Sequence, residues 1–109
     1  MDILERVKKY KIKTVDPIVH APVRLTILTV LISSKTTDLS CLHQVTETSH
    51  GNLGSHIQKL EKADYIDVKK TFVGKKPRTI LSITKLGRKA YKDYVQSIKN
   101  HLKYCNHEY

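Results

Sequence analysis

The chain has 109 residues, of which 39% are hydrophobic, and this length predicts a single folded domain over residues 1–109. Lys and Arg number 20 and Asp and Glu number 10, so the formal net charge of +10 favours an anionic partner. The longest apolar stretch, residues 25–32, is far shorter than the roughly 20 residues that a membrane span needs, which excludes a membrane-spanning protein and predicts no membrane partner.

The N-terminal residues and the two cysteines predict a cytoplasmic protein. Residues 1–6 have charges at helical spacing and lack the apolar centre of a secretory signal. Cys41 and Cys105 lie far apart and form no CxxC pair, which argues against a disulfide framework and against a structural zinc site. Together with the positive charge, these features lead us to expect a nucleoid-associated protein in a reducing compartment.

The first predicted elements are two helices. A short amphipathic helix is expected within residues 1–15, because Ile3, Val7 and Tyr10 share one helical face. Pro22 suits the first turn of a second helix, which we expect to continue to about residue 33. The apolar residues of this second helix occupy nearly all of its faces, as is typical of a helix at the centre of a small domain.

A helix, a tight turn and another helix are expected next. Thr37 and Asp38 supply N-cap chemistry for a short helix over about residues 39–45. Residues 46–49 read as the turn, and Ser49 can cap a helix over about residues 50–62. This last helix has an apolar face of Leu53, Ile57 and Leu60 and an opposite face that is polar and basic.

After this helix the pattern changes from a period of 3.6 to a period of two. Residues 66–72 and 79–83 alternate apolar and polar side chains, and residues 73–78 between them predict a turn. A final helix is expected over residues 84–105, with Thr84 as its cap. The sequence therefore predicts a β-hairpin followed by a long helix, in an α+β, mostly helical domain with its core over residues 20–83.

The positive charge is concentrated in the hairpin and the last helix. Residues 1–65 carry nine basic and seven acidic side chains, or +2, and residues 66–109 carry eleven basic and three acidic, or +8. Within residues 69–78 there are five basic side chains and no acidic one. This distribution predicts that the hairpin tip contacts phosphates.

A helix-turn-helix followed by a basic hairpin is the arrangement of a winged helix. Three segments carry a resemblance over roughly residues 16–95: DPIVHAPVRLTIL at 16–28, GNLGSHIQKLEKADYI at 51–66 and VGKKPRTILSITKLGRKAY at 73–91. The chain resembles the small single-domain winged helix-turn-helix transcriptional regulators related to the MarR and ArsR groups. The resemblance implies a recognition helix at Ser49 to Lys62 and a wing tip at Gly74 to Arg78. It also implies a transcriptional regulator that binds double-stranded DNA at specific sequences.

The predicted contacts with DNA fall into two groups. Polar side chains on the recognition helix offer donors and acceptors to base edges in the major groove, and basic side chains on the wing meet phosphates or the minor groove. The predicted recognition-helix contacts are Ser49, His50, Asn52, Ser55, Gln58, Lys59 and Lys62. The predicted wing contacts are Lys69, Lys75, Lys76 and Arg78.

The last helix also predicts a homodimer. A helix of about 20 residues extends roughly 30 Å, more than so small a domain covers, so part of its apolar stripe should meet a second subunit. The predicted interface consists of Ile3 and Val7 near the N-terminus and Tyr91, Tyr94, Ile98 and Leu102 on the last helix. Such a dimer places two recognition helices about one DNA turn apart, on a palindromic site.

The sequence gives little support for a metal site or an enzymatic active site. His101, Cys105 and His107 could hold a metal, but one cluster near a chain end is little support, and we expect no metal and no cofactor. No arrangement of nucleophile, base and oxyanion donors is recognisable, so we expect no enzymatic activity. Two alternatives to a regulator stay open: an architectural DNA-binding protein with little sequence preference, and a winged-helix module that binds other proteins. Whether a small-molecule effector acts on the protein is left open.

Overall fold

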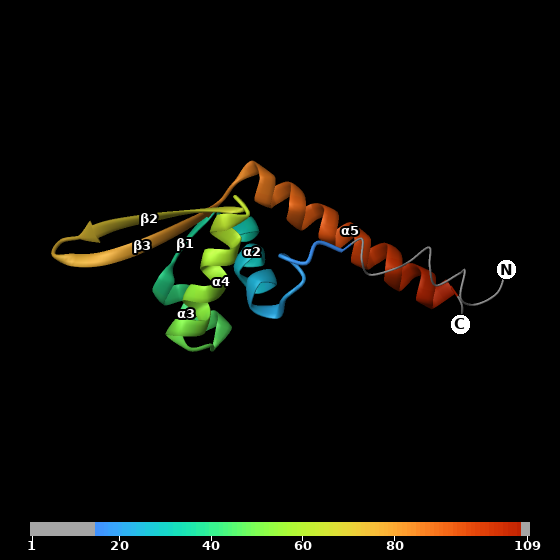
Figure 1. Ribbon diagram of the computed structural model, residues 1–109, viewed down its shortest axis with the longest axis horizontal. Helices are drawn as coiled ribbons and strands as arrows, with labels where there is room; N and C mark the ends of the chain where they lie inside the picture. Colours follow the sequence, from blue (N-terminus) through green and yellow to red (C-terminus); the bar gives the residue numbers. More distant parts are fainter. Residues whose placement is uncertain (1–14, 108–109) are drawn as a thin grey trace.

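The computed structural model describes residues 15–107, with the side chains of residues 104–107 left aside, and the helix predicted within residues 1–15 therefore lies outside the described residues (Figure 1). The fold is α+β and mostly helical, as predicted. Its elements are α2 (Pro22–Ser34), β1 (Thr36–Asp38), α3 (Leu39–Thr46), α4 (His50–Lys62), β2 (Ile66–Val73), β3 (Lys76–Ile83) and α5 (Lys85–His107).

Helix α2 lies at the centre of the domain, as its nearly continuous apolar surface predicts. It begins with Pro22 in its first turn, and Ile27, Leu28 and Leu31 are completely buried. The helix contacts α3, α4, α5, β1 and β3. Leu42 of α3 and Leu81 of β3 are also completely buried, so all of these elements share one core.

The sheet contains a strand that the sequence did not predict. Strand β1 pairs with β3 in antiparallel register, with Thr36 opposite Ser82 and Asp38 opposite Ile80, and the strand order is β1-β3-β2. Thr37 and Asp38 were expected to act only as helix caps. Three residues are too few to show a period of two, so this edge strand is defined by its pairing and not by a local pattern.

Strands β2 and β3 form a hairpin, residues 66–83, which we call the wing. The six-residue turn predicted over residues 73–78 is wrong, because Val73 pairs with Lys76 and only Gly74 and Lys75 lie between the strands. Gly74 has a φ of +65°, the left-handed conformation that glycine adopts without cost and that a type II′ turn needs at its first central position. The wing is therefore longer and its tip narrower than predicted.

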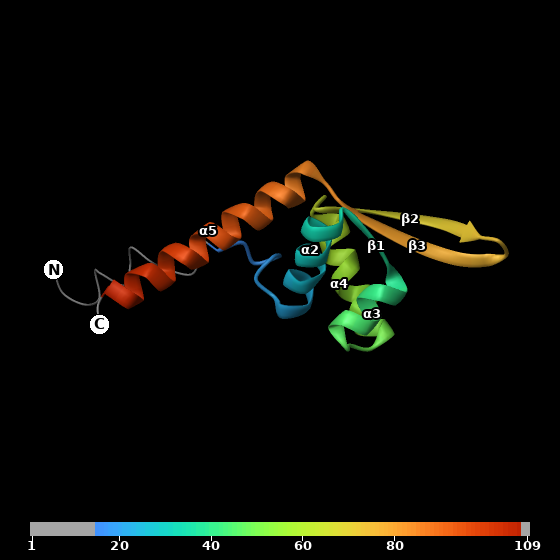
Figure 2. The same cartoon turned by 180° about the vertical axis from the view of Figure 1, so that it is seen from behind.

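Helix α5 begins as predicted and extends away from the body of the domain (Figure 2). The Thr84 hydroxyl accepts a hydrogen bond from the Gly87 N–H at 2.9 Å, which caps the helix. A Cβ atom on Gly87 would lie only 2.0 Å from the Tyr65 carbonyl oxygen, so no larger residue fits at this junction with the wing. None of the described helices is long and apolar enough to cross a membrane.

Residues 16–20, before α2, form hydrogen bonds with Tyr65, directly before the wing, and with α5. The Asp16 carboxylate accepts hydrogen bonds from the Ile18 N–H at 2.8 Å and from the Tyr65 hydroxyl. Burial and this bond to Asp16 raise the pKa of Tyr65 to about 12. The Tyr94 hydroxyl of α5 lies 3.0 Å from His20 Nδ1. These contacts fix the base of α5 next to the core.

Candidate nucleic-acid interface

Helix α4 has an anchored face and an open face. It spans residues 50–62, and the Ser49 hydroxyl accepts a hydrogen bond from the Asn52 N–H at 3.2 Å, as expected for its cap. Leu53 and Leu60 are completely buried, and Ile57 is 8% exposed. The residues predicted to contact DNA are all exposed: Ser49, His50, Asn52, Ser55, Gln58, Lys59 and Lys62. The structure thus places all seven on the solvent side of one firmly packed element.

The Asn52 side chain is held before any ligand arrives. Its Nδ2 donates a hydrogen bond to the Thr48 hydroxyl at 3.3 Å, and Thr48 lies in the turn before α4. Thr48 was not among the predicted site residues, although a hydroxyl four positions before an asparagine at a helix start is a signal that could have revealed it. A restrained amide loses less conformational entropy when it binds a base edge.

A buried arginine supports the inner side of α4. Arg24 of α2 is only 9% exposed, and its guanidinium donates hydrogen bonds to the Ile18 carbonyl at 2.7 Å and to His56 Nδ1 at 3.2 Å. Because arginine has no acceptor, His56 Nδ1 is the acceptor and must be unprotonated. Burial lowers the pKa of His56, and the charges of Arg24 and Lys59 lower it further. The helix is thus tied to α2 and to the segment before it.

Two histidines stack at the entrance of α4. The rings of His43, in the last turn of α3, and His50, the first residue of α4, have centroids 3.9 Å apart and planes 8° from parallel. Glu47 between them has a φ of +53°, which turns the chain sharply. The sequence predicted His50 as a site residue but missed His43, since the stacking depends on the path of the turn.

The exposed lysines of the wing form its basic surface. Lys69, Lys75 and Lys76, the lysines predicted to contact DNA, are exposed, and Lys70 is exposed as well. The sequence from Val68 to Ile83 contains no acidic residue that would offset them. Lysine side chains attract phosphates irrespective of base sequence, so the charge of this surface suits the backbone of a nucleic acid.

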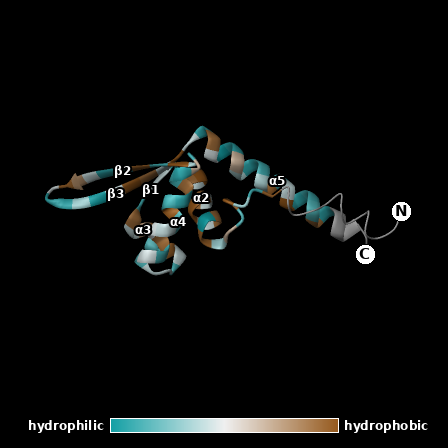
Figure 3. Ribbon diagram, in the orientation of Figure 1, coloured by the Kyte–Doolittle hydropathy of each residue, from teal (hydrophilic) through white to brown (hydrophobic). Residues whose placement is uncertain are grey.

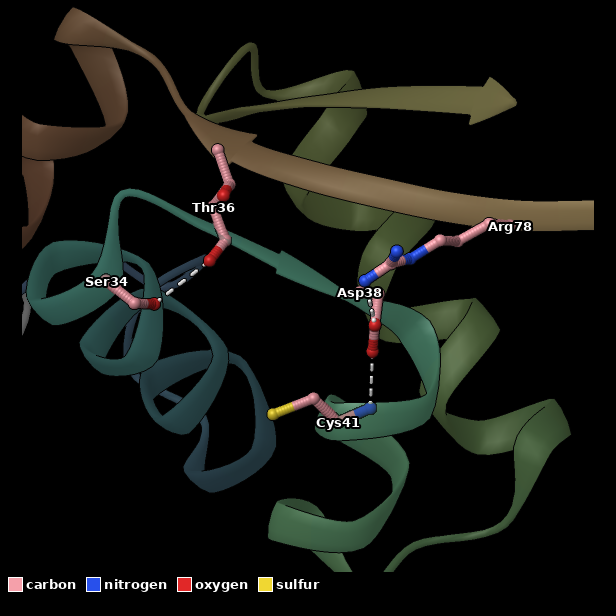
Figure 4. Close-up of polar contacts among 5 residues, drawn as sticks. All are labelled: Ser34, Thr36, Asp38, Cys41 and Arg78. Carbon is pink, nitrogen blue, oxygen red and sulfur yellow. Dashed lines mark hydrogen bonds and ion pairs between the residues drawn. The ribbon is translucent and has the colours of Figure 1, made fainter. Parts of the chain in front are cut away.

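Arg78 of the wing is part of an ion pair that the sequence did not predict. Its guanidinium donates to Asp38 Oδ2 at 2.8 Å, while Asp38 Oδ1 accepts from the Cys41 N–H at 2.8 Å (Figure 4). The bond from the Cys41 N–H and the contact with Arg78 lower the pKa of Asp38. One carboxylate thereby caps α3 and holds β3 at Arg78, so Arg78 is less free than the wing lysines to meet a phosphate.

The residues predicted for a dimer interface occupy different environments. Tyr94 is 9% exposed and bonded to His20, and the Tyr91 hydroxyl lies 3.0 Å from the Thr29 hydroxyl, so both contribute to packing within the protomer. Ile98 is half-buried and Leu102 is 54% exposed. The predicted contacts Ile3 and Val7 lie outside the described residues.

Among the side chains that the structure describes, no group of three or more His, Cys, Asp or Glu residues could hold a metal ion. Of the three candidate ligands, only His101 belongs to this set, because the side chains of Cys105 and His107 fall outside it.

Three comparisons place this arrangement among known proteins. Residues 23–102 match the family described as the winged helix DNA-binding domain. An uncharacterized protein of Methanocaldococcus jannaschii is 32% identical over 81 residues, which are 74% of this chain and 88% of that protein. A transcriptional regulator homologue from Pyrococcus horikoshii OT3 has a TM-score of 0.77 and 29% identity, with 91% of this chain and 95% of that chain covered.

A more distant structure, ytfH of Salmonella typhimurium, shares the fold. Its TM-score is 0.65 at 20% identity, with 89% of this chain and 79% of that chain covered. The long C-terminal helix and the wing are therefore features of a fold that this chain has in common with transcriptional regulators.

Proposed function

Because the chain belongs to the winged helix DNA-binding domain family, a DNA-binding and not an enzymatic family, we propose that it is a transcriptional regulator that binds specific sequences in double-stranded DNA. One observation carries this proposal. The exposed face of α4 combines Asn52, Ser55, Gln58 and Lys59 on a helix whose opposite face is buried. Asn and Gln suit adenine, and Lys suits guanine, in the major groove.

The proposed binding mode uses α4 and the wing together. Helix α4 enters the major groove, and Lys69, Lys75 and Lys76 meet phosphates or the minor groove beside it. Arg78 contributes to this surface mainly by fixing strand β3 of the wing to Asp38. Residues 1–109 act as one domain, in the cytoplasm and associated with the nucleoid.

The proposed assembly is a homodimer. Helix α5 has 23 residues and extends beyond the body of the domain (Figure 2), and its distal part carries the exposed Leu102 and the half-buried Ile98. We propose that these two residues, together with Ile3 and Val7, meet the second subunit. Sedimentation of the protein at micromolar concentration tests this: a dimer supports it, and a monomer contradicts it.

Selection of bound duplexes from a random pool at near-physiological salt, followed by footprinting, tests the function itself. A recovered inverted repeat supports a sequence-specific dimeric regulator. Tight binding without any enriched sequence supports an architectural protein, which the net charge of +10 also permits. Absence of duplex binding leaves a protein-interaction module.

A further inference from the structure

The tip of the wing is apolar as well as basic. Phe72, the single phenylalanine of the sequence, is 70% exposed, and its neighbour Val73 is 56% exposed. Phe72 pairs across the hairpin with Pro77, directly beside the turn. Figure 3 shows the end of β2 near the turn in the colour of hydrophobic residues, beside hydrophilic residues at the turn. A large aromatic ring thus lies near the tip of the wing, exposed to solvent.

The position of Phe72 has no explanation in the packing of the domain. Side chains alternate along a strand, so Phe72 lies on the same face of β2 as Ile66, which is 1% exposed, and Val68, which is half-buried. This face meets the core only at the base of the wing. At 70% exposure, the ring of Phe72 contributes little to the hydrophobic core, and exposing it to water is unfavourable.

The charge around the ring identifies the kind of partner. Lys70, Lys75 and Lys76 lie within four positions of Phe72 along the chain, and no acidic residue occurs between Val68 and Ile83. A partner for this surface must therefore be strongly anionic and must also offer an apolar slot for a ring. The faces of the bases in a DNA duplex provide such a slot when a base step opens toward the minor groove.

The dimensions of the wing fit this partner. Eight residues in each strand give a hairpin roughly 26 Å long, whereas the minor groove lies about half a helical turn, roughly 17 Å, from the major groove on the same side of the duplex. With α4 in the major groove, the adjacent minor groove is the surface of the duplex that a hairpin of this length can enter.

We propose that Phe72 is an apolar wedge that enters the minor groove, partly unstacks one base step and bends the DNA. This inference rests on the proposed function, because it needs a duplex bound through α4. Flexible pyrimidine–purine steps are the expected sites of insertion, since they open at the lowest energetic cost. The wing then contributes a preference for deformable DNA in addition to its attraction for phosphates.

The test uses the whole chain and duplexes from the bound pool of the selection described above, with 2-aminopurine replacing adenine at one pyrimidine–purine step at a time. Wild-type protein should raise the fluorescence of one such step several-fold and should bend the duplex in a circular-permutation assay. Phe72→Ala should abolish both signals and weaken binding about tenfold, with the salt dependence unchanged. Phe72→Leu should retain part of the signals.

Val73→Ala is the matched control, because Val73 is an exposed apolar neighbour on the opposite face of β2, and it should leave both signals intact. Binding by the wild type without unstacking or bending overturns the wedge and leaves the proposed function standing. Equal signals from Phe72→Ala and the wild type also overturn the wedge. Failure of the wild type to bind any duplex overturns both proposals.

Discussion

Helix α4 and the wing are neighbours in the proposed DNA-binding surface, yet they depend on the core to very different degrees. Helix α4 sends Leu53, Ile57 and Leu60 into the core along its whole length. The wing meets the core at its base, through Ile66 and Leu81, and the Asp38–Arg78 ion pair holds β3 farther out. Most of the residues toward its tip are exposed. A rigid element and a projecting ribbon therefore act side by side.

Helix α4 and the wing also differ in the charge of their exposed side chains. Residues 49–59 of the α4 region contain one Lys and no Arg, and their open face is mostly uncharged. Residues 69–78 of the wing contain five basic side chains and no acidic one. Reading base edges requires donors and acceptors at fixed positions, whereas attraction to phosphates tolerates movement. In the proposed binding mode, the anchored helix reads the base edges, and the projecting wing supplies affinity for phosphates and a preference for deformable DNA.

The largest expected effect is on the free energy of unfolding, and it follows from the burial of α4. Leu53→Ala removes a completely buried side chain and should lower the free energy of unfolding by about 3 kcal/mol, through lost burial and the cavity left behind. Phe72→Ala on the wing should change it by no more than about 0.5 kcal/mol, because that ring is exposed. Urea denaturation followed by circular dichroism measures both, and equal losses would refute the difference in anchoring.

The ion pair between Arg78 of the wing and Asp38, the N-cap of α3, gives a smaller effect. Asp38→Asn keeps a good N-cap for α3 but removes the charge that holds Arg78, and should cost less than about 1 kcal/mol at pH 7 because the pair is partly exposed. The pKa of Asp38 is lowered in the folded protein, so its stabilisation is complete above the unfolded value of 3.8 and is lost as the pH falls through the folded pKa.

Urea denaturation of Asp38→Asn and of the wild type, at pH 7 and in acid, measures how the stabilisation by the Asp38 charge changes with pH. The difference from the wild type should shrink in acid. Asp67→Asn, which removes the same charge from an exposed position on β2, is the control and should show a smaller difference at pH 7. A difference that grows in acid would contradict the role of the Asp38 charge.

The smallest expected effect concerns the inner side of α4. The folded protein lowers the pKa of His56, so the unfolded chain takes up a proton first as the pH falls. The stabilisation is complete above the unfolded value of 6.5 and is lost as the pH falls through the folded pKa. His56→Gln, whose amide oxygen can still accept from Arg24, should lose less stability than the wild type between neutral and mildly acidic pH. Identical pH profiles from thermal unfolding would contradict this.

Local signals made α4 predictable from the sequence. The hydroxyl of Ser49 and the spacing of Leu53, Ile57 and Leu60 act over a few residues, and each is found where it was expected. The cap of α5 at Thr84 is an equally local signal, and it is confirmed as well. The hairpin itself was predicted from its alternation, but its turn was placed wrongly. A glycine can start a two-residue turn or lie within a longer loop, and pairing of the strands decides between them.

Contacts between distant residues could not be predicted. Asp38 and Arg78 are 40 positions apart, Thr29 and Tyr91 are 62 apart, and His20 and Tyr94 are 74 apart. Hydrophobic spacing marked Tyr91 and Tyr94 as apolar positions without showing that their hydroxyls bond within the protomer. Strand β1 was missed for the same reason, because its three residues are defined by a partner far along the chain.

The division of labour between α4 and the wing is tested most directly by the salt dependence of DNA binding, measured on a selected duplex and on a scrambled one. Lys75→Ala with Lys76→Ala should weaken both complexes alike and reduce the slope of log K against log salt by about 2. Asn52→Ala with Gln58→Ala should leave the slope unchanged and reduce the preference for the selected duplex about tenfold or more. The opposite pattern, with sequence preference lost in the wing variant and the salt slope lost in the α4 variant, would contradict the account.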